Sequence, residues 1–249
     1  MLDISIKAEK IFLLGSFPVT NALLLSIGTL AILVTGSVVL HRKLAIIPGA
    51  FQNFLEMILD GALKLMESVL GDRETSEKYL PLIATIFFFV LVSNLLGLLP
   101  IVGSIGIHTL HEGKEAFIPI FRSPASDLNF TIILAIIAVT SINALGFAAL
   151  GFKRYAGRFF NFRNPIQGFA GILELISEFV KIVSFSFRLF GNIFAGEVLL
   201  TVIGFLVPYL IPLPFLFLEF FVAFIQAFIF AMLTLVFVGI AVSHHETTH

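Results

Sequence analysis

The sequence contains no cysteine and no tryptophan, and it has few charged residues. Without cysteine, the chain can form no disulfide, no thiolate metal site and no cysteine nucleophile. Charged residues make up 12% of the 249 positions, against roughly 25% in ordinary soluble domains. So few charges could not cover the surface of a soluble globule that is this apolar. A soluble fold is therefore excluded.

Apolar residues dominate what remains. They make up 58% of the chain, and 30 positions are phenylalanine. This composition excludes intrinsic disorder, which needs low hydrophobicity. The net charge of −1 argues against nucleic acid as a partner. The sequence therefore predicts an all-α integral membrane protein in a lipid bilayer, with residues 1–249 forming a single membrane domain.

Five regions are long and apolar enough to cross a bilayer, since a crossing needs about 20 residues. The segment 1–16 lacks a clean basic region and a small-residue cleavage site, so we expect an uncleaved first span. Three prolines between Val207 and Pro214 break the last apolar region and predict a helical hairpin. The predicted spans are 17–40, 79–99, 128–152, 166–206 and 214–243.

Residues 48–71 differ from these spans. Their apolar side chains recur every three or four positions, and polar side chains fill the other face. This spacing predicts an amphipathic helix. We expect it to lie in the membrane interface, and packing against another helix is the alternative.

Basic residues indicate the orientation, because short cytoplasmic loops are rich in lysine and arginine. The loop 153–165 contains Lys153, Arg154, Arg158 and Arg163 and no acidic residue. We therefore predict that this loop is cytoplasmic, that the 100–127 loop is external, that the N-terminus is outside and that the C-terminus is inside. The most compatible location is a bacterial inner (plasma) membrane, with an organelle-encoded protein as the second option.

The fourth span is too long for one upright crossing. Residues 166–206 would extend about 60 Å as a helix, twice the roughly 30 Å of hydrocarbon, so this helix must tilt or curve. It also contains Glu174, Glu178, Lys181, Arg188 and Glu197. A charge at mid-membrane costs ~2.5–3.5 kcal/mol even on lenient scales, which makes such residues functional candidates.

Helical spacing divides these side chains between two faces. At about 100° per residue, Glu174, Lys181, Arg188 and Asn192 share one stripe, and Glu197 points to the opposite side. A line of small residues beside the Arg188 stripe would let another helix approach closely. The final helix adds Glu219 and Gln226 on one face.

Each candidate could also have a purely structural role. Glu174, Glu178 and Lys181 could be interfacial side chains or form a local salt bridge. Arg188 could belong to a structural ion pair, Glu197 and Glu219 could be protonated structural carboxyls, and Asn192 and Gln226 could only join helices. No cofactor, metal site or catalytic residue is predicted.

The hairpin register brings candidates from the two helices to the same depth. In an antiparallel hairpin, residues at equal depth have a nearly constant sum of residue numbers. The pair Arg188 and Gln226 sums to 414, and the pair Glu197 and Glu219 sums to 416. We therefore expect Gln226 level with Arg188, and the two glutamates together about 13 Å nearer the outside.

Several motifs resemble those of one family. The run Ser186-Phe-Arg188-Leu-Phe-Gly-Asn192-Ile-Phe-Ala-Gly-Glu197 closely resembles the signature of subunit a of the F-type ATP synthase. The stretch from Leu218 to Phe230 is similar to the last helix of that family. The segments 93–100 and 124–129 resemble two further family motifs, so the likeness covers nearly the whole chain.

The resemblance implies a role for each candidate. Arg188 would be the essential arginine, and Gln226 the glutamine near it. The chain would be the non-catalytic stator subunit beside a rotating ring of c subunits, with the b subunits of the peripheral stalk as further partners in the ATP synthase complex. Two offset half-channels would bring H⁺ or Na⁺ to the ring carboxylates past Glu197 and Glu219, and release it near Glu174. Arg188 would separate the two half-channels.

A stand-alone ion channel or secondary transporter is the rival class. Five spans without an inverted repeat and a single arginine-bearing face argue against it. A purely structural membrane scaffold is the third interpretation, and it leaves Arg188 and the two distant glutamates unexplained.

Overall fold

The computed structural model describes residues 8–242 except 16, 46–47, 100–101, 103–104, 112–113, 152–154, 156, 158, 160–164 and 208–209. Within these residues, five helices are long and apolar enough to cross a membrane. The predicted all-α membrane class is therefore confirmed. The five helices are α1 (Asn21–Lys43), α3 (Arg73–Gly97), α5 (Leu128–Leu150), α7 (Pro165–Leu206) and α8 (Pro212–Val242).

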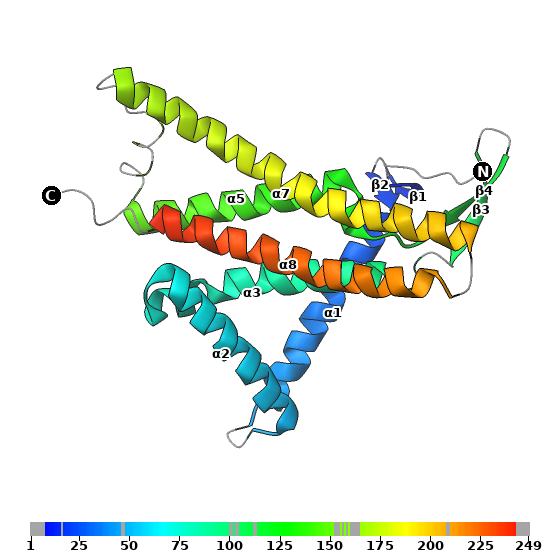
Figure 1. Ribbon diagram of the computed structural model, residues 1–249, viewed down its shortest axis with the longest axis horizontal. Coiled ribbons are helices and arrows are strands. Elements are labelled where there is room, and N and C mark those ends of the chain that lie inside the picture. The colour runs from blue at the N-terminus through cyan, green and yellow to red at the C-terminus, as the bar shows by residue number, and fades with distance from the viewer. Residues whose placement is uncertain are drawn as a thin grey trace.

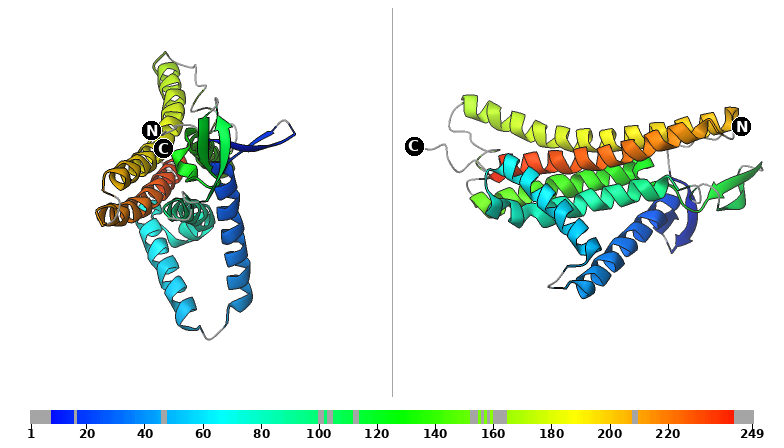
Figure 2. Two further views of the ribbon diagram at one scale, coloured as in Figure 1. Left: turned by 90° about the vertical axis from the view of Figure 1, so that its right-hand side faces the viewer. Right: turned by 60° about the horizontal axis from the view of Figure 1, so that its bottom comes forward.

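Four of these helices form the body of the molecule. Helix α8 packs against α3, α5 and α7, and α5 packs against α7. Figure 1 shows α7 and α8 side by side toward one end, whereas the beginning of α7 stands away from the other helices. Figure 2 shows the same divergence from a second direction. A 42-residue helix is about 60 Å long, so its two ends cannot both pack on shorter neighbours.

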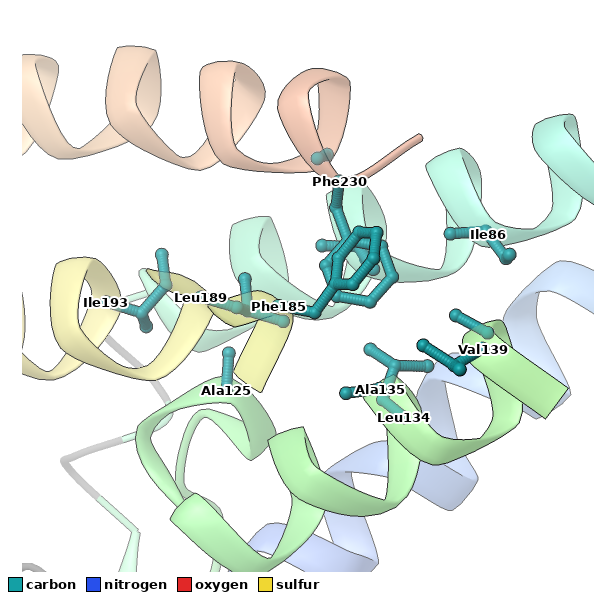
Figure 3. Close-up of a cluster of buried hydrophobic side chains, with 12 residues drawn as sticks. Ile86, Ala125, Leu134, Ala135, Val139, Phe185, Leu189, Ile193 and Phe230 are labelled. Atoms are coloured by element: carbon teal, nitrogen blue, oxygen red, sulfur yellow. The ribbon is translucent and has the colours of Figure 1, made fainter. Parts of the chain in front are cut away.

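A hydrophobic core joins the four helices at their centre. Phe185 of α7 and Phe230 of α8 have ring centroids 4.8 Å apart. Figure 3 shows these rings facing Leu134, Ala135 and Val139 of α5. Small alanines on α5 and α8 are fully buried here and allow the helices to approach closely.

The register between α7 and α8 follows from two close approaches. Phe185 contacts Phe230, and the carboxylate of Glu219 lies against the backbone at Gly196. Both pairs of residue numbers sum to 415. This value lies between the sums of 414 and 416 obtained for the polar pairs from the sequence, so the expected register is present in the fold.

Helices α1 and α2 (Ala50–Leu70) extend away from this body. Helix α1 packs on α3, and α2 packs on α3 and α8. The two helices diverge from the bundle and come together only at their connection (Figures 1 and 2). Leu63 and Met66 near the end of α2 are buried, whereas Phe51, Phe54 and Met57 near its start are exposed. One half of this amphipathic helix thus packs on the protein, and the other half leaves its apolar face uncovered.

Charges fix the corner between α2 and α3. The backbone turns at Gly71, whose φ is 91°. Arg73 then bonds Glu67 at 3.2 Å and Glu77 at 2.9 Å. The Asp72 side chain caps α3 by accepting the backbone N–H of Thr75, and this hydrogen bond lowers the pKa of the Asp72 carboxyl. The chain therefore enters α3 at a fixed angle.

Several boundaries differ from the sequence prediction. The first helix covers Asn21–Lys43 rather than 17–40, because Phe17–Thr20 form a strand and Thr20 caps the helix. The next span begins at Arg73, six residues before position 79, because Asp72 is an N-cap. The third span ends at Leu150 rather than 152, and Gly151 has a φ of 79°.

Two small antiparallel hairpins add strands that the sequence did not predict. Strand β1 (Lys10–Leu14) pairs with β2 (Phe17–Thr20), and β3 (Gly106–His111) pairs with β4 (Lys114–Pro119). The second hairpin lies within the 100–127 loop and is followed by the short 3₁₀ helix η1 (Pro124–Ser126). Both hairpins lie near the end of the bundle at which α7 turns into α8 (Figure 1).

Candidate functional site

Arg188 lies near the middle of α7 on an exposed face. Its guanidinium has one hydrogen-bonding partner among the described residues, the hydroxyl of Ser184 at 3.3 Å. No carboxylate in the described part of the chain lies within ion-pair distance of it. Asn192, one turn further along, is exposed on the same face. A structural ion pair among the described residues therefore does not account for Arg188.

Small residues surround Arg188 on the exposed face of α7. Ser184, Gly191 and Ala195 are exposed beside it, and a Cβ added at Gly191 would meet no atom within 4 Å. Long apolar side chains such as Phe179 and Phe187 continue the exposed surface along α7. An always-charged guanidinium thus stands on a face whose other exposed residues near it are small, apolar or, like Asn192, polar and uncharged.

Glu219 and Gln226 of α8 are buried, in contrast to Arg188. Glu219 is 5% exposed and Gln226 is 7% exposed. The Glu219 carboxylate occupies the space that a side chain at Gly196 would fill, since an added Cβ would lie 2.0 Å from Oε2. Glycine at position 196 therefore gives Glu219 its place between α7 and α8.

Glu197 has a partner that the sequence analysis missed. Its Oε1 forms an ion pair with Arg122, whose Nε lies 3.2 Å away. The Nε–H of Arg122 donates its hydrogen bond to the hydroxyl of Ser126 at 3.1 Å. The carboxylates of Glu197 and Glu219 are at the predicted common level but form no hydrogen bond with one another. One signal for Arg122 was available, because an arginine in a loop predicted to be external departs from the usual distribution of basic residues.

Some buried polar atoms lack hydrogen-bonding partners, and they include one atom of this ion pair. In the described part of the chain they are Ser93 Oγ, both amide atoms of Asn94, Ser123 Oγ and Glu197 Oε2. Ser123 lies against Gly97, where an added Cβ would be 2.5 Å from it. Ser93 is one helical turn below Gly97 on the same face of α3. These residues lie along one part of α3 and in the segment just before η1, which follows the β3–β4 hairpin; we call them the polar region.

The other half of α7 shows a different arrangement. Lys181 bonds Glu178 at 2.6 Å, so of the alternatives left open for this pair the structure contains the local salt bridge. Glu174, one turn closer to the start of α7, is partly exposed. It is separated from Arg188 by about 21 Å along the helix. The six predicted site residues thus occupy three places: the Arg188 face, the buried Glu219 side and the start of α7.

A bundle of apolar helices with a buried carboxylate, at Glu219, and an arginine without an acidic partner among the described residues defines a class of protein. It is a multi-pass membrane protein with ionisable groups inside the membrane region, which is typical of proteins that move ions across a bilayer.

Comparison with known proteins identifies the family. The model of the ATP synthase A chain family matches residues 23–239, and the chain belongs to this family. It is 34% identical over 208 residues to ATP synthase subunit a of Campylobacter concisus, covering 83% of each chain. It is 32% identical over 240 residues to the Moorella thermoacetica subunit, covering 96% of this chain and 99% of the relative. The Campylobacter jejuni protein is 36% identical over 201 residues, which are 80% of this chain and 79% of the relative.

Membership confirms the resemblance found in the motifs. The chain is a multi-pass, non-catalytic membrane subunit of the F-type ATP synthase. It belongs to the ATP synthase complex and takes part in ion transport coupled to ATP synthesis.

Proposed function

We propose that the chain is the stator of a rotary motor and forms two offset half-channels for H⁺ or Na⁺. Each half-channel leads to carboxylates on a rotating ring of c subunits. Arg188 separates the two. The observation that carries this proposal is the isolation of Arg188, which has no acidic partner among the described residues. The exposed residues around it are small, apolar or, like Asn192, uncharged.

The electrostatics of that face support the mechanism. A desolvated cation attracts a deprotonated carboxylate strongly in a medium of low dielectric constant, and it repels another cation. A ring carboxylate would therefore lose its proton as it reaches Arg188, and a free cation could not pass directly between the half-channels. A membrane potential supplies about 2.3 kcal/mol per charge per 100 mV for each step.

The outer half-channel would use the buried polar region. Glu197 and Glu219 take up the ion from outside, and the unpartnered atoms near Ser93 and Ser123 bind water that connects them to the exterior. Asn192 and Gln226 orient groups near Arg188. On the other side, ions leave toward the cytoplasm near Glu174. The long tilted α7 follows the curved surface of the ring, and the b subunits of the peripheral stalk hold the chain in place.

Substitution of Arg188 tests the proposal. Arg188→Lys and Arg188→Ala should each abolish ATP-driven ion pumping in vesicles while the complex still assembles. Lysine is no substitute because its ammonium is a compact, strongly hydrated charge that loses its proton readily when buried. Near-normal coupled pumping by either variant would rule out the proposed role of Arg188.

The orientation is a separate part of the proposal, with the N-terminus outside and the C-terminus in the cytoplasm. The absence of cysteine allows single cysteines to be placed at Glu67 and Arg158. In intact cells an impermeant thiol reagent should leave both cysteines unlabelled until the membrane is opened. Labelling of either one from outside would reverse the orientation.

A further inference from the structure

A partly buried series of hydrogen bonds connects α5 to the first half of α7, before Arg188. Asn143 of α5 donates from Nδ2 to Glu178 Oε2 at 3.1 Å. Lys181 donates to the other oxygen, Glu178 Oε1, at 2.6 Å. The side chains of Lys181 and Glu178 are only 17% and 16% exposed. Both oxygens of the carboxylate are thus occupied.

Two aromatic residues complete this arrangement. The Lys181 ammonium lies 4.7 Å from the ring centroid of Phe237 on α8, where the negative face of the ring attracts it. Tyr155 donates its hydroxyl to Asn143 Oδ1, and its ring lies against the backbone at Gly146. Tyr155 is 1% exposed. The amide of Asn143 therefore accepts a hydrogen bond from Tyr155 through its oxygen and donates one to Glu178 through its nitrogen.

Lys181 connects this series of hydrogen bonds to the helix face that bears Arg188. Seven residues separate the two, so their directions from the helix axis differ by only about 20°. A cavity of about 150 Å³ lies between them. It is lined by Val180, Lys181, Ser184, Phe185, Arg188, Leu233 and Phe237. Lys181 thus starts on the Arg188 stripe, but its ammonium is turned inward toward Glu178 and Phe237.

We infer that Glu178, oriented by Asn143, is a positioning residue that keeps the Lys181 ammonium off the face that meets the ring. The inference rests on the proposed function. With Lys181 held inward, a ring carboxylate that moves past α7 meets one uncompensated cation, Arg188. With Lys181 released, the four-carbon side chain reaches the same face about 10 Å away and offers the carboxylate a second ion-pair partner. The rotor then stalls at this second site.

Neutralising Glu178 tests the inference. In the assembled ATP synthase in vesicles, Glu178→Gln should lower ATP-driven pumping at least fivefold, because Lys181 loses its ionic partner. The double variant Glu178→Gln with Lys181→Gln should recover at least half of the parent rate, because the released cation is gone. A role in packing alone would make the double variant no better than the single one, so failure to recover overturns the inference. Parent-like pumping by Glu178→Gln overturns it as well.

A second pair covers the case in which Glu178→Gln does not assemble. Asn143→Leu keeps both charges and removes only the bond that orients the carboxylate, so we expect about a twofold loss of pumping. Adding Lys181→Gln to Asn143→Leu should raise the rate again, and no rise overturns the inference. Arg188→Ala, measured in parallel, tests the proposed function by itself. If that variant pumps normally the half-channel mechanism fails, whatever the Glu178 variants do.

Discussion

The polar side chains near the two halves of α7, before and after Arg188, differ in whether they have hydrogen-bonding partners. Toward the start of the helix, Asn143, Glu178 and Lys181 satisfy one another in a continuous chain. Toward the end, Glu197 keeps one buried carboxylate oxygen without any partner, and Ser123 has a buried hydroxyl in the same condition.

This difference suggests that the paired groups stabilise the fold and that the unpaired groups bind water. A buried polar atom without a partner costs about 1–3 kcal/mol, and natural proteins usually satisfy such atoms with bound water. The paired chain needs no water and fixes one geometry. The unpaired region needs water, and a chain of water molecules is what proton movement requires. On the proposed function, we therefore expect conduction through the Glu197 half and positioning by the Glu178 half.

The largest expected effect comes from removing both carboxylates of the outer half. Passive proton conduction through the membrane sector should fall severalfold in Glu197→Gln and in Glu219→Gln, and at least tenfold in the double variant, because neither site could then bind and release a proton. Fluorescence quenching in vesicles stripped of the catalytic head measures the rate.

Assembly and ATP hydrolysis by the catalytic head serve as the control, and both should stay close to the parent values. If all three variants conduct like the parent, the two glutamates are structural and the comparison between the halves loses its functional meaning.

A smaller effect should follow from adding one methyl group to α7. An alanine Cβ at position 196 would lie 2.0 Å from Glu219 Oε2, so the carboxylate must move. We expect Gly196→Ala to reduce passive conduction about three- to tenfold. Shortening the displaced side chain with Glu219→Asp should recover part of the loss.

Gly204 provides the matched control. It lies on the same helix, and a Cβ there would meet nothing within 4 Å. Gly204→Ala should therefore conduct like the parent. Equal losses in Gly196→Ala and Gly204→Ala would mean that helix stiffness, and not the position of Glu219, controls conduction.

The sequence predicted the helices and the register better than the partners of the polar side chains. Apolar length and proline positions are local signals, and each of the five predicted spans overlaps one of the five long apolar helices. The register of α7 on α8 followed from residue numbers because the connecting turn is short. Thr20 and Asp72 moved two helix starts because N-caps override hydrophobicity at helix ends.

The pairing of Glu197 with Arg122 could not be read from the sequence in this way. The two residues are separated by two helices and a loop, and no helical periodicity connects them. Glu178 and Lys181 were predicted as a possible pair because they are three residues apart on one helix, where helical periodicity makes them neighbours. Asn143 as their third partner depends on the rotation of α5 about its own axis, which is set by the packing of α5 against α7 and α8.

The smallest and most discriminating effect concerns single hydroxyl groups in the two halves. Tyr155→Phe removes the hydroxyl that bonds Asn143, and Ser93→Ala removes a buried hydroxyl that has no partner. Losing a satisfied buried hydrogen bond costs about 0.5–1.5 kcal/mol, whereas losing an unsatisfied hydroxyl is nearly neutral. The two substitutions should therefore affect different properties of the protein.

We expect Tyr155→Phe to lower stability by about 1 kcal/mol in detergent-induced unfolding, with passive conduction reduced less than twofold. Ser93→Ala should leave the unfolding midpoint unchanged and reduce conduction about twofold, because a water molecule in the polar region loses one of its anchors. The pair forms its own control, since each variant loses a single oxygen atom. If Ser93→Ala loses stability and keeps full conduction, the outer polar region is structural like the inner one, and water-mediated conduction must be sought elsewhere in the bundle.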